Sequence, residues 1–157
     1  MGVMGITGVI GAHHMLSPGK PRLPSHLRSA RTWAVLTVIL AGAGLYTLGA
    51  QPFAAGLFPA PWDKLAHVVT FALIGSATGV ASGARGWRRT ACCIAGAVAI
   101  GILDELHQAY LPGRIASWSD LAADAMGGLL GAVLLAAGEA GMRRRVSRRH
   151  SSIVKHR

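Results

Sequence analysis

Eight polar residues that are able to bind ligands or transfer protons lie between residues 63 and 124 of a largely apolar chain. Asp63 and His67 are four residues apart, so a helix places them on one face. A histidine near carboxylates is able to act as a general acid or base, and an arginine is able to bind an anionic group. The complete set is Asp63, Lys64, His67, Glu105, Gln108, Arg114, Asp120 and Asp124.

The composition indicates that this set belongs to a membrane protein. Of 157 residues, 52% are apolar and only 14% are charged, whereas a soluble domain carries about a quarter charged residues. Residues 32–62 contain no Asp, Glu, Lys or Arg. This content excludes a disordered chain. The net charge of +10 lies mostly outside the apolar stretches, so it is explained by membrane topology and predicts no nucleic-acid partner.

Four apolar stretches predict an all-α integral membrane four-helix bundle. Two of them are too short alone to cross about 30 Å of hydrocarbon, so their helices must include the polar turns at residues 104–110 and 120–124. The predicted spans are Trp33–Gln51, Lys64–Gly83, Thr90–Tyr110 and Asp120–Gly138.

The basic residues predict the orientation of this bundle. Lys and Arg cluster before the first span, at Arg85–Arg89 and after Glu139, whereas the other side carries only Lys64 and Arg114. The positive-inside rule therefore places both the N and C termini in the cytoplasm. We predict three segments: a disordered basic N-terminal tail at 1–31, a membrane domain at 32–138 and a basic cytoplasmic C-terminal tail at 139–157.

The acidic residues have the opposite distribution. Only Glu139 falls on the cytoplasmic side. At about 100° per residue, Asp120 and Asp124 share a helix face with Gly127 and Gly131, and small residues at this spacing let helices approach closely. We therefore expect these acids to face other helices. The acids predicted on the outer side are Asp63, Asp104, Glu105, Asp120 and Asp124.

Three of these polar residues also have structural interpretations. Asp63 follows Pro61 and is able to cap the N-terminus of the second span. Asp120 completes Ser117-Trp118-Ser119-Asp120, which has the pattern of a capping box. Arg114 is able either to bind an anionic group or to pair with Asp120 or Glu105.

The polar set resembles the signature of the VanZ-like membrane proteins. The matching pattern is Asp63-Lys64-x-x-His67, Glu105-x-x-Gln108, Pro112-Gly113-Arg114-x-x-Ser117-x-x-Asp120 and x-x-x-Asp124-x-x-Gly127, within residues 62–138. The resemblance implies a four-span, multi-pass protein of the bacterial cytoplasmic membrane. Members near the founding type are linked to low-level teicoplanin resistance, and the family supplies no catalytic roles to carry over. One departure is Asp124, where the family commonly has Asn.

Two functions remain open from the sequence. The first is recognition of a cell-envelope component or glycopeptide by the outer polar residues, for teicoplanin-type resistance or envelope homeostasis. The second is a membrane enzyme acting on a lipid-linked envelope substrate, with His67 oriented by Asp63 and Glu105 as the other acid or base. Whether the protein is an enzyme therefore stays undecided.

Other ligands and partners are less favoured. His67, Asp104, Glu105 and His107 are metal-binding residue types, but no HExxH or comparable spacing appears, so no metal and no cofactor are predicted. A transporter would need polar residues through the whole bilayer. The expected partners are the lipid bilayer, an envelope precursor or glycopeptide and, from the pairs Gly75/Gly79 and Gly127/Gly131, a second copy of the chain.

Overall fold

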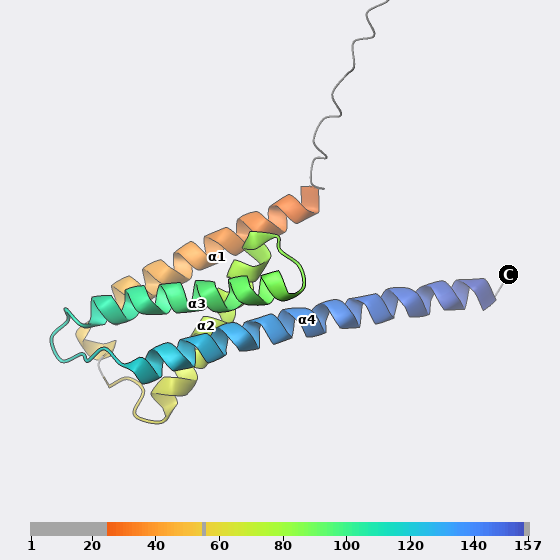
Figure 1. Cartoon of the computed structure of the whole chain (residues 1–157). Helices are drawn as coiled ribbons and strands as arrows, with labels where there is room; N and C mark the ends of the chain where they lie inside the picture. Colours follow the sequence, from red (N-terminus) through yellow and green to blue (C-terminus); the bar gives the residue numbers. More distant parts are fainter. Residues whose placement is uncertain (1–24, 55, 156–157) are drawn as a thin grey trace, which may run out of the picture.

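The computed structural model of this protein describes residues 25–54 and 56–155, with side chains as far as residue 148. Four long helices make up most of this part of the chain, and it contains no strand. Successive helices run in opposite directions (Figure 1). Their bounds are α1 Ser25–Gly49, α2 Trp62–Ser82, α3 Trp87–Gln108 and α4 Trp118–Lys155, with a short 3-10 helix, η1, at Pro52–Ala54.

All four long helices are long and apolar enough to cross a membrane. At 1.5 Å per residue, the 22 residues of α3 extend about 33 Å, which matches the hydrocarbon core. The polar residues from Asp104 to Gln108 form the last turns of α3, and those from Asp120 to Asp124 lie in the first turns of α4. The prediction of an all-α four-helix membrane bundle is confirmed.

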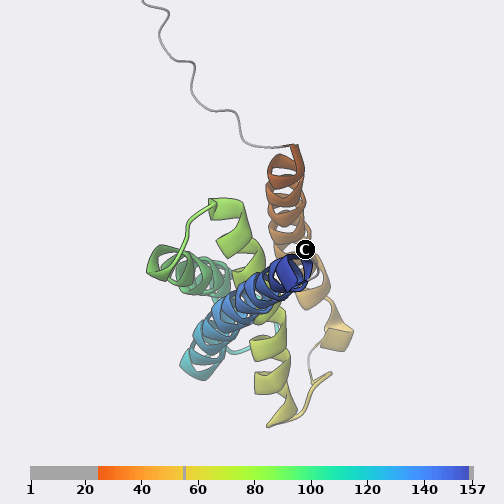
Figure 2. The ribbon, with the colours of Figure 1, turned by 90° about the vertical axis from the view of Figure 1, so that its right-hand side faces the viewer.

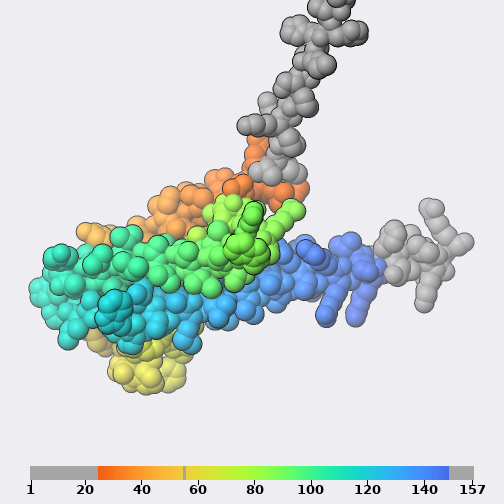
Figure 3. All heavy atoms as spheres, viewed as in Figure 1, coloured from red at the N-terminus to blue at the C-terminus, as the bar shows by residue number. Residues whose placement is uncertain are grey.

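The tail boundaries differ from the expected ones. Residues 25–31, expected in the disordered tail, form the first turns of α1. Arg31 supports these turns because its Nε donates a hydrogen bond to the carbonyl of Ala81, 3.0 Å away at the end of α2. Residues 1–24, the rest of that predicted tail, lie outside the described residues. At the other end, α4 continues past Gly138 to Lys155. Its coloured part in Figure 3 extends beyond the bundle.

Close contact between α2 and α4 holds the bundle together. A side chain at Gly127 would place its Cβ 2.6 Å from the carbonyl oxygen of Val68, and one at Gly131 would meet the carbonyl oxygen of Ala72. Only glycine permits this approach of the two backbones. The predicted inward face of the fourth span is therefore confirmed.

The same contacts account for the other glycine pair. A Cβ at Gly75 would lie 2.8 Å from the Cα of Gly128, and Gly79 lies against the sulfur of Cys93. All of these glycines thus pack within one chain. They no longer argue for association of two copies, which stays a prediction.

The apolar core is small and lies below the polar end of the bundle. Phe71, Ile74 and Ala97 are fully buried, and Ala41 and Leu45 of α1 pack against them. Helix α1 lies at the periphery (Figure 2), where Ala34 is its buried residue and Leu40 is 70% exposed. In a bilayer, such exposed apolar side chains face lipid.

Candidate functional site

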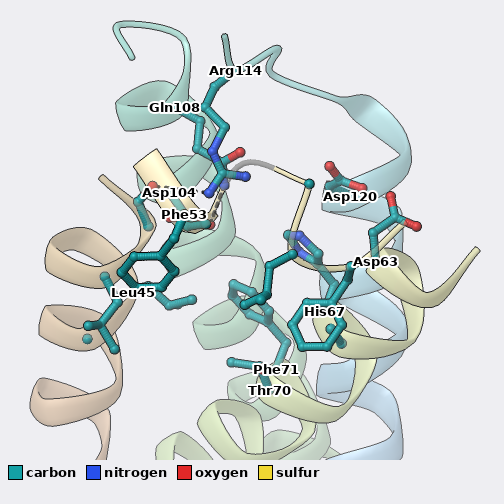
Figure 4. Close-up of a pocket in the computed structure, with 18 of the residues that line it drawn as sticks. Leu45, Phe53, Asp63, His67, Thr70, Phe71, Asp104, Gln108, Arg114 and Asp120 are labelled. Carbon is teal, nitrogen blue, oxygen red and sulfur yellow. Dashed lines mark hydrogen bonds between the residues drawn. The ribbon is translucent and has the colours of Figure 1, made fainter. Parts of the chain in front are cut away.

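All eight polar residues singled out from the sequence lie at one end of the bundle, where α1 and α3 end and α2 and α4 begin. We call them the polar cluster. Asp63, Lys64 and His67 come from the first two turns of α2, and Arg114 comes from the connection between α3 and α4. Figure 4 shows several of these side chains converging from these elements. The other members are Glu105, Gln108, Asp120 and Asp124.

His67 and Asp124 form the deepest pair of the cluster. The Nδ1 of His67 lies 2.8 Å from Oδ1 of Asp124, and Asp124 is fully buried. Gly101 of α3 makes room for this carboxylate, since a Cβ there would lie 3.0 Å from the Cγ of Asp124. The expectation that Asp63 orients His67 is wrong: although Asp63 and His67 share a helix, the partner of the imidazole comes from the facing helix.

Lys64 joins α2 to the beginning of α4. Its ammonium group forms ion pairs with Asp120 and with Asp63, the latter at 3.0 Å. Asp63 lies in the first turn of α2 after Pro61, and the N-terminus of this helix has no side-chain cap hydrogen bond. The capping role proposed for Asp63 is therefore not found; its carboxylate pairs with Lys64 instead.

Glu105 replaces Asp120 as the acid that supports the beginning of α4. The backbone N–H of Ser117, which precedes the helix, donates to Oε2 of Glu105 at 2.5 Å. A capping box would use the carboxylate of Asp120 for this bond, but Asp120 is paired with Lys64. Helix α3 thus caps α4 across the bundle. The second carboxylate oxygen of Glu105, Oε1, is buried and has no hydrogen-bond partner.

Arg114 holds the end of α1. Its guanidinium donates a hydrogen bond to the carbonyl of Gly49 at 3.1 Å. Carbonyls at a helix C-terminus lack partners within the helix, so a cation is favourable there. The proposed pairing of Arg114 with Asp120 or Glu105 is not found, because those carboxylates bond to Lys64 and Ser117.

Three further residues belong to this end of the bundle, although they were not among the eight: Asp104, Tyr46 and His107. Asp104 is buried and accepts a hydrogen bond from Gln108 at 2.8 Å. The ring of Tyr46, near the end of α1, stacks on His107 with centroids 3.8 Å apart. Asp104 was recognisable as an acid on the outer side, whereas nothing in an uncharged first span marks Tyr46.

Five of the eight residues of the polar cluster line a cavity of about 730 Å³: Asp63, His67, Gln108, Arg114 and Asp120. In Figure 4, Asp63 and Asp120 lie on one side of it and Gln108 and Arg114 on the other, while Thr70 and Phe71 lie deeper. Its apolar wall comes largely from α1, η1 and the connection to α2, and includes Leu45, Leu48, Phe53, Leu57 and Phe58. A volume of this size is in the usual range for small-molecule sites. Sequence reasoning missed the apolar wall because these residues are typical of a span and its loop.

Fold and site together define a four-span α-helical membrane protein with a polar cavity at one end of its bundle. Comparison with known families gives this class a name. The VanZ/LLP1 family matches residues 22–138, so the chain belongs to this family. This match confirms the resemblance seen in the sequence and extends it over the first span. No curated protein and no solved structure matches the chain.

Proposed function

We propose that the cavity binds a cell-envelope component or a glycopeptide at the extracytoplasmic surface of the bacterial cytoplasmic membrane. The observation that carries this proposal is the two-part lining of the cavity. Charged and amide groups surround one region of it, and aromatic and aliphatic side chains of α1, η1 and α2 surround the rest. An amphiphile with a polar head and an apolar portion suits such a lining.

The distribution of charge supports the extracytoplasmic position. Arg85 lies in the connection between α2 and α3, Arg88 lies in the first turn of α3, and the far part of α4 carries Arg143 to Arg145; all lie at the end of the bundle away from the cavity. Basic residues remain in the cytoplasm during insertion. Trp118 and Tyr110 are each 87% exposed near the cavity and suit a membrane interface there.

The proposal is tested by expressing the protein in a teicoplanin-susceptible host and measuring the host's susceptibility to the drug. Expression of the protein is expected to raise the minimum inhibitory concentration of teicoplanin, and Glu105→Gln or Arg114→Ala is expected to abolish that increase. Glu139→Gln, which removes the acid at the opposite end, is the matched control and keeps the increase. Direct titration of the purified protein with fluorescent teicoplanin checks that the same variants lose binding.

Two results would overturn this proposal. One is full resistance in both cluster variants at equal expression. The other is a purified, folded protein that binds neither teicoplanin nor lipid-linked envelope precursors in nanodiscs.

A second candidate function is supported by the His67–Asp124 pair. A buried carboxylate that orients an imidazole beside a cavity is an arrangement used for general acid–base catalysis. The alternative is a membrane enzyme that acts on a lipid-linked envelope substrate, with His67 and Glu105 as acid and base. Mass spectrometry of lipid-linked precursors incubated with the protein tests it. Conversion that is lost in His67→Ala and kept in Glu139→Gln would favour catalysis over binding, whereas unchanged precursors would count against it.

A further inference from the structure

Three residues of the polar cluster from three different helices come close enough to share one ion. His67 of α2, Glu105 of α3 and Asp120 of α4 each offer a nitrogen or oxygen atom, and these atoms all lie within 4.8 Å of one another. The residues are far apart in sequence, so no motif could reveal them. Asp104 and His107, which the sequence also suggested as metal-binding types, are not part of this group.

The carboxylate of Glu105 has an unused oxygen. Glu105 is 8% exposed, and its Oε2 is held by the N–H of Ser117. Its Oε1 is buried without a hydrogen-bond partner. Leaving a buried carboxylate oxygen unsatisfied is costly, and a bound cation removes that cost.

The imidazole of His67 is already oriented for a ligand. Its Nδ1 is engaged by the buried Asp124, which leaves Nε2 as the ring nitrogen available to a metal. Histidines that bind metals almost always bond to a carboxylate, a backbone carbonyl or water through the other ring nitrogen, which fixes the tautomer and the ring orientation. Asp124 would have this supporting role.

The charges near the cluster also favour a cation. Two basic side chains, Lys64 and Arg114, face a larger number of carboxyl groups. A dication would offset part of this excess. Without a metal, Lys64 forms ion pairs with Asp120 and, at 3.0 Å, with Asp63. If Asp120 bound a metal instead, Lys64 would still have Asp63 as its partner. The carboxylates are Asp63, Asp104, Glu105, Asp120 and Asp124.

We propose that His67, Glu105 and Asp120 bind one divalent transition-metal ion, with Zn²⁺ as the best fit. One imidazole nitrogen with two carboxylate oxygens suits zinc better than the all-oxygen preference of Ca²⁺ or Mg²⁺. Three protein ligands leave a fourth position open, and His67 and Asp120 both line the cavity. This inference concerns the metal alone and does not depend on the proposed envelope ligand.

Metal content of the purified protein tests this inference. The full chain is purified through a tag without histidine, stripped with a chelator, incubated with Zn²⁺ and desalted. Mass spectrometry of the metal is expected to give about one Zn²⁺ per chain. Competition with a chelating dye is expected to show at least a tenfold weaker affinity in Glu105→Gln and His67→Ala, and no change in His107→Ala, the matched histidine control.

A spectroscopic measurement on the unmodified protein keeps the test decisive if a variant misfolds. Replacing Zn²⁺ by Co²⁺ is expected to give the visible absorption of a low-coordinate site. A folded protein that retains no Zn²⁺ and shows no such spectrum would overturn the inference, and so would equal Zn²⁺ affinity in the two ligand variants. Loss of teicoplanin binding with one Zn²⁺ retained would count against the proposed function alone.

Discussion

The two ends of the bundle use charge in different ways. At the basic end, Arg89 of α3 binds Glu139 of α4 through both carboxylate oxygens, and the side chain of Glu139 stays 44% exposed. At the acidic end, buried polar atoms lack partners. Among the described residues, the buried side-chain atoms without a hydrogen bond are Asp63 Oδ1, Glu105 Oε1, His107 Nδ1 and Asp124 Oδ2.

This difference separates a structural contact from a binding site. Arg89, with 16% of its side chain exposed, and the half-exposed Glu139 satisfy each other, so nothing further is needed there. The acidic end buries more hydrogen-bonding capacity than its own side chains use, and this imbalance is expected where a ligand or ion completes the structure.

The largest expected effect is a difference in cysteine labelling between the two ends of the bundle, because we predict that they lie on opposite sides of the membrane. In a Cys92→Ala background, Ala116→Cys lies in the connection beside the polar cluster and Arg85→Cys lies at the basic end. Cys93 is fully buried and is kept. We expect an impermeant thiol reagent to label Ala116→Cys in intact cells and Arg85→Cys only after lysis.

The background protein without either new cysteine is the control for this experiment. The reverse labelling pattern would place the polar cluster in the cytoplasm. The envelope ligand of the proposed function would then be replaced by a cytoplasmic one.

The next largest effect concerns the His67–Asp124 pair. Asp124→Leu is expected to lower the free energy of unfolding by about 3–5 kcal/mol, because it leaves His67 without its partner in a buried site. Asp124→Asn keeps an oxygen that accepts a hydrogen bond from Nδ1, so a clearly smaller loss is expected. Thermal unfolding in detergent measures both variants. Equal losses would show that the charge of Asp124, and not its hydrogen bond, stabilises the pair.

A smaller effect is expected from the helix contact that carries the cluster. Gly127→Ala is expected to cost about 1–3 kcal/mol, since its Cβ would meet the backbone of α2. Gly138→Ala is the matched control because nothing lies within 4 Å of its Cβ, and it is expected to leave stability unchanged or slightly raised. Thermal unfolding of both variants checks the difference, and a stable Gly127→Ala protein would contradict the close packing of α2 and α4.

The smallest effect is expected at the basic end. Arg89→Ala is expected to cost only about 1 kcal/mol or less, because the exposed Glu139 returns to water. Teicoplanin susceptibility and Zn²⁺ content are expected to stay unchanged. If Arg89→Ala lost teicoplanin resistance or Zn²⁺ binding at equal expression, the two ends of the bundle would be coupled through α3 and α4.

The sequence predicted the spans, the inward face of α4 and the gathering of polar residues at one end. These features follow from hydrophobic length and helix periodicity, which are local properties. The partners within the cluster were not predictable. Asp63 and His67 share a face of α2, yet the rotation of α4 against α2 decides that Asp124 reaches the imidazole.

Contacts made outside the helices were also beyond the sequence. Arg114 bonds to a backbone carbonyl of α1, and backbone groups carry no residue-specific signal. Glu105 acts as the cap of α4 by bonding to Ser117, twelve residues later and just before the helix begins, through a connection whose path depends on its turns. Residues 25–31 extend α1 into a basic segment that composition alone assigned to a tail.

The peripheral position of α1 has a consequence for how the cavity is filled. In the most apolar 18-residue stretch of α1, 6% of the residues are buried, against 28–33% in the corresponding stretches of the other described spans. Even so, α1 supplies Leu45 and Leu48 to the cavity wall. Displacing α1 therefore exposes less packed surface than displacing any other span. The wall that α1 contributes to the cavity therefore belongs to the least buried of the four described spans, and in a bilayer α1 has lipid on its other side. An acyl chain would thus have a sideways route from the bilayer, without passing through water.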